Sequence, residues 1–239
     1  MSQNTETGSA KIVANFEELL SRITTLGSVY QPASDSLKLP ALQAALNSAR
    51  DSISALNTAN AVYAKAVDAR QAAFEGLSKL STRVINMLKA SVDDKAQAET
   101  AAALVKKLRG DGKKASATDL LKATEQAPKT ISTAQSSYDM KLEHFSKLIE
   151  VLLQSDSYAP QEAELKTDAL LELKADLKTK TNTVIMAKAA SDTARANRDQ
   201  LIFSDTGLVP MALNVKTYLR AALTSSSPQY KPIMALPFK

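Results

Sequence analysis

One uninterrupted apolar stripe constrains the fold more than any other feature of this sequence. Across residues 39–90, apolar side chains recur at alternating gaps of four and three, the spacing of one face of a long α-helix. Its members are Leu42, Leu46, Ala49, Ile53, Leu56, Tyr63, Val67, Phe74, Leu77, Val84 and Leu88, with Asn60, Arg70 and Ser81 as polar exceptions. Pro40 suits a first helical turn, and within this range only Gly76 could end the helix early. The pattern predicts a helix about 75 Å long and therefore an elongated molecule.

A second long helix is predicted over residues 161–203, closed by Gly207 and Pro210. Shorter amphipathic helices are predicted over residues 9–27, 95–110, 116–126, 130–154 and 210–223. We therefore expect an all-α fold, an elongated antiparallel helical bundle built on the two long helices. Residues 1–9 read as a polar leader, residues 10–224 as a single bundle, and residues 225–239 as an extended apolar tail.

The chain also reads as two copies of one unit, over residues 10–110 and 116–224. In each copy a helix with a Phe-x-x-Leu-Leu or Phe-x-x-Leu-Ile motif is followed by Tyr-x-Pro (Tyr30 and Tyr158) and then by a long helix. Residues 70–74 align with 198–202, and residues 84–90 with 215–221. Both interpretations stay open, a true duplication and a coincidence between two alanine-rich amphipathic segments.

The residue inventory gives no support to enzyme function. The chain has no cysteine, which excludes thiol nucleophiles, cysteine-ligated metal and disulfides. His144 is the only histidine, and without a second ligand at metal-binding spacing it reads as a structural or surface residue. No phosphate-binding glycine loop is present. The sequence therefore predicts a non-enzymatic protein with no catalytic, cofactor or metal site.

The N-terminus and the hydropathy pattern bear on location. Residues 1–10 lack the basic start and apolar core of a signal peptide, and no apolar run approaches the roughly 18 residues that span a membrane. We expect a cytoplasmic protein, although export by a non-classical route is left open.

Two groups of basic residues are candidates for ion pairing or binding. Arg70 falls within the apolar stripe and Arg198 in the aligned position, so each is a candidate for a structural ion pair that fixes helix register. The densest basic cluster comprises Lys106, Lys107, Arg109, Lys113 and Lys114. It reads either as a solvated helix end or as a contact for nucleic acid, anionic lipid or an acidic partner. No aromatic residue interleaves with it, which disfavours nucleic acid.

The C-terminal tail differs in composition from the rest of the chain. Its three serines and Pro228, Pro232 and Pro237 predict that it forms no helix. Its apolar residues are Tyr230, Ile233, Met234, Leu236 and Phe238, too many for a disordered segment. An extended apolar segment needs a groove, either on its own bundle or on a neighbouring subunit. For docking on a neighbouring subunit, our candidate groove lies between residues 16–26 and the long helix.

Several stretches together resemble a group of bacterial all-helical proteins of unknown function, chiefly from Bacteroidetes. They are Tyr-x-Pro before a long alanine-rich helix, Leu-Ser-Lys-Leu-Ser-Thr-Arg-Val at residues 77–84, and Ser-Pro-Gln-Tyr-Lys at residues 227–231 before a Phe-Lys terminus. The resemblance implies a bacterial origin and an all-helical fold.

From the sequence as a whole we expect a structural or scaffolding protein that self-associates through its tail. The alternative is a binding module for an anionic partner that uses the basic cluster. No small-molecule substrate is indicated.

Overall fold

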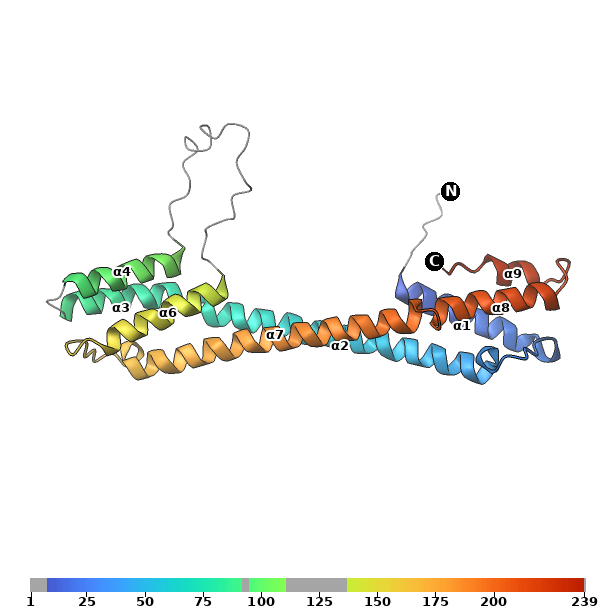
Figure 1. Cartoon of the computed structure of the whole chain (residues 1–239), viewed down its shortest axis with the longest axis horizontal. Helices are drawn as coiled ribbons and strands as arrows, with labels where there is room; N and C mark the ends of the chain where they lie inside the picture. Colours follow the sequence, from blue (N-terminus) through green and yellow to red (C-terminus); the bar gives the residue numbers. More distant parts are fainter. Residues whose placement is uncertain (1–7, 92–94, 111–136, 239) are drawn as a thin grey trace, which may run out of the picture. The chain divides into compact units, whose positions relative to one another are not determined.

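A computed structural model describes residues 8–91, 95–110 and 137–238 of the 239-residue chain. Every regular element in these residues is helical, which confirms the prediction of an all-α helical bundle (Figure 1). The main helices are α1 (Ser9–Thr25), α2 (Leu39–Glu75), α3 (Leu77–Ser91), α4 (Lys95–Arg109), α6 (Tyr138–Leu153), α7 (Thr167–Phe203), α8 (Leu208–Ala222) and α9 (Tyr230–Ala235). The helix predicted over residues 116–126 lies outside the described residues.

The predicted 39–90 helix is divided at Gly76, so its prediction as one helix is wrong in this respect. Gly76 lies in a turn after Glu75, and its carbonyl accepts a hydrogen bond from the Leu80 amide at 3.0 Å, which begins α3. Glycine is a poor helix former because it loses the most backbone entropy on ordering. The apolar stripe nevertheless continues through the break, since Leu77, Val84 and Leu88 are all buried.

The described residues pack as two compact units. Unit 1 contains the residues up to Tyr63 and from Ala187 onward, and unit 2 contains Ala64–Met186. The long helices α2 and α7 each contribute residues to both units. Each unit takes elements from both predicted repeat halves, residues 10–110 and 116–224, because α1 packs with α8 and α4 packs with α6.

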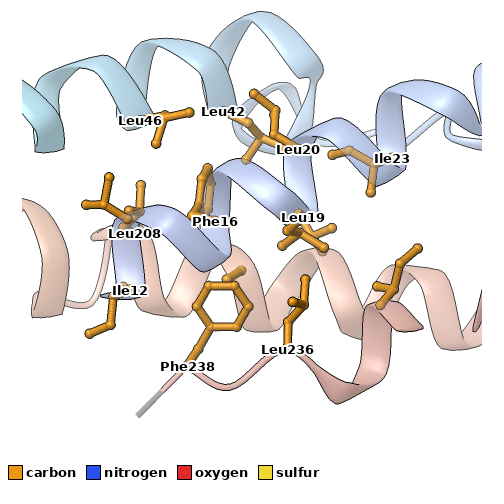
Figure 2. Close-up of a cluster of buried hydrophobic side chains, with 14 of the residues drawn as sticks. Ile12, Phe16, Leu19, Leu20, Ile23, Leu42, Leu46, Leu208, Leu236 and Phe238 are labelled. Carbon is orange, nitrogen blue, oxygen red and sulfur yellow. The ribbon is translucent and has the colours of Figure 1, made fainter. Parts of the chain in front are cut away.

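The core of unit 1 is built from α1, the start of α2, the end of α7, α8 and the tail. Figure 2 shows α1 between α2 on one side and α8 with the tail on the other. The most buried residues are Ile12, Phe16, Leu19, Ile23, Leu42, Leu46, Ile202, Leu208, Val215, Leu219 and Ile233. Burying an aliphatic or aromatic side chain contributes about 1.5–3 kcal/mol, so this cluster is the main source of stability in the unit.

The core of unit 2 is built from the end of α2, α3, α4, α6 and the start of α7. Helix α4 packs along both α3 and α6. The most buried residues are Leu77, Val84, Leu88, Ala101, Leu108, Phe145, Leu148, Ile149, Leu152, Leu170 and Leu177. The alanine-rich face of α4 lets it approach closely, whereas Leu108 supplies bulk.

The order and length of the helices repeat along the chain. Helices α2 and α7 each have 37 residues, and α3 and α8 each have 15. Helix α1 precedes the first pair as α6 precedes the second. The predicted duplication is therefore supported by matched elements, although it stays a prediction. On this correspondence each unit combines elements of both copies.

The two Tyr-x-Pro motifs perform the same structural task. The Tyr30 hydroxyl donates to the Leu37 carbonyl at 2.6 Å, and the Tyr158 hydroxyl donates to the Leu165 carbonyl at 2.8 Å. Each bond closes the loop that leads into a long helix. Burial raises the pKa of both tyrosines to about 12, with a smaller contribution from Tyr218 for the first and from Glu162 for the second.

The glycines that precede α3 and α8 provide a matched test. A Cβ at Gly207 would lie 2.8 Å from the backbone C and O of Ile202, whereas a Cβ at Gly76 meets nothing within 4 Å. We expect Gly207→Ala to destabilise the fold by about 1–3 kcal/mol because the clash is with backbone. We expect Gly76→Ala to be neutral or to stabilise by up to about 1 kcal/mol. Urea denaturation followed by circular dichroism measures both, and equal effects would contradict the close approach at Gly207.

Candidate functional site

The C-terminal tail lies on its own unit, against α1 and α8. It is not extended throughout, because Tyr230–Ala235 forms the short helix α9. The prediction that its prolines preclude a helix is therefore wrong. Pro232 is the third residue of α9, where a backbone N–H would have no partner inside the helix, so proline costs little there.

Three apolar side chains anchor the tail. Ile233, Leu236 and Phe238 are all buried, and the Phe238 ring meets the Phe16 ring edge-on with centroids 6.5 Å apart. Figure 2 places Leu236 and Phe238 on the side of α1 that faces away from α2. The tail on its own unit therefore does not occupy the groove between residues 16–26 and the long helix, and that groove stays a prediction for docking on a neighbouring subunit. Of the other predicted tail residues, Met234 packs on the edge of this core, and Tyr230 is half-buried.

Two buried polar side chains hold the tail through its backbone carbonyls. The Asn15 amide donates to the Pro237 carbonyl at 2.8 Å. The Lys216 ammonium donates to the Met234 carbonyl at 3.1 Å and, in a short bond, to the Leu236 carbonyl. It also lies 5.2 Å from the centroid of the Phe238 ring. These bonds satisfy carbonyls at the end of α9 that no helical amide can reach.

Lys216 is an unusual residue for this position. It is only 6% exposed, and burial, followed by the nearby Arg220 charge, lowers its pKa. The aligned residue in the first copy is Ile85, which is also buried but packs in unit 2. In unit 1 the tail covers α8, whereas in unit 2 helix α4 covers α3. The tail presents backbone carbonyls that need hydrogen-bond donors, which explains a lysine at the position where α3 has an isoleucine.

The residue aligned with Asn15 is His144, since each directly precedes the phenylalanine of its Phe-x-x-Leu motif. His144 is 4% exposed, so it is a structural residue and not a surface one. Burial lowers its pKa; the Glu143 charge opposes this, and the Lys107 and Lys147 charges add to it.

The structure brings part of the predicted basic cluster to one groove. Lys106, Lys107 and Arg109 are exposed in the last turn of α4, whereas Lys113 and Lys114 lie outside the described residues. Lys106 and Arg109 line a hollow of about 300 Å³ between α3 and α4. The other lining residues are Thr82, Ile85, Asn86, Lys89, Ala102 and Val105. Sequence reasoning missed Lys89, because only the pairing of α3 with α4 brings it to the groove.

The two candidate ion-pair arginines differ. The Arg70 guanidinium stacks over the Tyr138 ring at 4.2 Å, and no ion pair within the described residues involves it. Arg198 pairs with its neighbour Asp199, with 3.0 Å between Nε and Oδ1. A pair between adjacent residues cannot fix the register of two helices. Asn60, another polar exception in the stripe, accepts a hydrogen bond from the Ser191 hydroxyl at 2.7 Å.

No family model, curated protein or solved structure matches the chain. The resemblance to a bacterial helical group therefore stays a prediction. Within the described residues, no group of three or more acidic or histidine side chains is placed to hold a metal ion. None of the described helices is long and apolar enough to cross a membrane.

Lys216→Met should loosen the tail while keeping an apolar side chain of similar length. The carbonyls of Met234 and Leu236 would each lose a partner, which costs about 1–3 kcal/mol for buried polar groups. Hydrogen–deuterium exchange of residues 224–238 should rise, whereas α1 should change little. Lys11→Met, at an exposed position of α1, is the control. Unchanged exchange in the Lys216 variant would show that the apolar anchors hold the tail alone.

His144 should make unit 2 less stable at acidic pH. The unfolded histidine binds a proton near its ordinary pKa of 6.5, but the folded one binds it only at lower pH. Stability is therefore complete above about pH 7 and falls as the pH drops through 6.5 towards the lowered folded value. Urea midpoints at pH 7.5 and 5.5 measure this. Because the chain has 1 histidine, His144→Asn should flatten the difference, and a persistent slope would contradict the assignment.

Proposed function

We propose that this chain is a non-enzymatic structural or scaffolding protein that self-associates through its C-terminal tail. The observation that carries the proposal is the docking of the tail on α1. The tail follows α8, an element of the second copy, yet Phe238 and Pro237 dock on Phe16 and Asn15 of α1, an element of the first. The contact therefore joins the tail to a helix that is distant in sequence. A second molecule of the protein has the same tail and the same binding surface on α1.

Self-association through this contact requires tail exchange, because the tail occupies the binding surface of its own unit. The connector, residues 223–229, is mostly exposed and is held by turn bonds such as the Ser227 amide to the Thr224 carbonyl at 2.9 Å. If the connector straightens, the tail can make all of its contacts on a second molecule of the protein. Reciprocal exchange gives a closed pair of chains, whereas one-way exchange gives rings or open filaments.

The proposal includes a cytoplasmic location and no catalytic role. The apolar tail supports self-association, and the absence of cysteine and of a histidine pair in the sequence supports the lack of a catalytic role. A second candidate function is binding of an anionic partner through the last turn of α4. The groove where Lys106 and Arg109 meet Lys89 favours it.

Shortening the connector tests tail exchange directly. Deleting Ser225, Ser226 and Ser227 removes residues that the chain needs to reverse direction after α8. The tail can then reach only the binding surface of a second molecule. We expect the mass measured by light scattering to double, with unchanged helix content. The native chain should form the same pair only at high concentration.

A matched pair of substitutions shows whether the tail makes the contact. Phe238 is 6% exposed and Phe203 is 48% exposed. Adding Phe238→Ala to the shortened chain should return it to the monomer mass, because truncating a buried phenylalanine costs about 3–5 kcal/mol. Adding Phe203→Ala should leave the pair intact. A shortened chain that stays monomeric would refute exchange, and a pair that survives Phe238→Ala would place the contact elsewhere.

A further inference from the structure

The α3–α4 groove collects positive charge without any acidic residue in its lining. Lys89 comes from α3, and Lys106 and Arg109 come from α4. Each belongs to the last turn of its helix, where a cation also complements the helix dipole. The dipole explains each residue singly, but it does not explain why three of them line one hollow of about 300 Å³.

Several basic residues on other faces of the described helices are neutralised by an acid. Arg22 pairs with Glu18 at 2.6 Å, and Arg83 pairs with Glu164 at 2.7 Å. In contrast, no ion pair within the described part of the chain involves Lys89 or Lys106. Like charges held in one hollow repel each other and attract a counter-ion, because low-dielectric walls focus their field.

The uncharged residues of the groove narrow the class of ligand. The Thr82 hydroxyl donates to the Ser78 carbonyl at 2.9 Å, which leaves its oxygen free to accept, and the exposed Asn86 amide can donate. Ile85, Ala102 and Val105 add an apolar surface. A hollow of this size and polarity suits a small oxyanion attached to an apolar or sugar-like group.

We propose that the groove between α3 and α4 binds a phosphate group through Lys89, Lys106 and Arg109. The proposal rests on the second candidate function, the binding of an anionic partner, and names the ligand class and the site. The phosphate belongs either to an anionic lipid headgroup or to a free phosphorylated molecule, and both present the same oxygens to the three cations.

Unit 1 provides an internal contrast. The residues aligned with Thr82 and Ile85 are Leu213 and Lys216, and Lys216 is committed to the tail carbonyls. Helix α4, the source of Lys106 and Arg109, has only the tail as its counterpart. The described residues therefore offer this arrangement once, in unit 2.

Two phosphate probes and one sulfated probe test the inference on the full chain. Calorimetry measures binding of inorganic pyrophosphate, and co-sedimentation measures binding to phosphatidylcholine vesicles with and without phosphatidylglycerol. Retention on heparin reports general anion binding. We expect at least one phosphate probe to bind, and Lys89→Glu and Lys106→Glu each to weaken that binding about tenfold.

The control is Lys95→Glu, which makes the same charge change at the start of α4, outside the groove lining. It should alter affinity by less than about twofold, the change expected of a solvent-screened charge that does not line the groove. Lys106→Gln, which removes the charge of this side chain without reversing it, serves if the charge reversal unfolds α4. Pyrophosphate binding assigns a free phosphate, and vesicle binding alone assigns a lipid headgroup.

Two results would overturn the inference. One is equal weakening by Lys95→Glu, which means a diffuse charge effect. The other is that neither phosphate probe binds. If the protein is still retained on heparin in that case, only the phosphate site is refuted and the binding of an anionic partner stays a candidate function. If heparin does not retain it either, both the phosphate site and that function are refuted.

Discussion

The structure depends on burial of apolar faces from the first half of the sequence by helices from the second half. Phe16 and Leu42 share a core with Leu208 and Ile233, and Leu88 and Leu108 share a core with Phe145 and Leu170. Because each long helix supplies residues to both cores, neither half of the sequence can bury its apolar stripe alone. The stability of each unit is therefore tied to both halves of the sequence.

The two units differ where α4 has no full counterpart. A 15-residue helix covers α3 and α6, whereas a 6-residue helix with a short extended end covers α8 and α1. The shorter cover leaves carbonyls that need donors, and Lys216 and Asn15 supply them. A buried ammonium costs solvation free energy, so its retention indicates that the tail contact stabilises the unit enough to offset that cost.

Much of the fold follows from periodicity in the sequence. The heptad-like stripe, the glycine and proline positions and the repeat of Tyr-x-Pro predict the helices and their order. The tail was harder to predict, because helix propensity treats proline as a breaker regardless of its place in the first turn. The break at Gly76 agrees with the low helix propensity of glycine, and a Cβ at this position would meet nothing within 4 Å.

The candidate sites were only partly predictable. The apolar tail and the basic turn of α4 are visible as composition, but their partners are not, because Lys89 and Phe16 are distant in sequence from the groups they meet. One signal could have revealed Lys216: it is a lysine aligned with Ile85 in an otherwise apolar helix face. A polar residue that replaces an apolar one between repeats indicates a different neighbour.

The most direct test of this account is to express residues 1–110 and 137–239 as separate chains, alone and together. If each core needs both halves of the sequence, the two chains will co-purify in equal amounts with the helix content and cooperative unfolding of the intact protein. Each fragment alone will either remain unfolded or form a homodimer, since the helices that cover its long helix belong to the other fragment. Two fragments that fold separately as stable monomers would contradict the account.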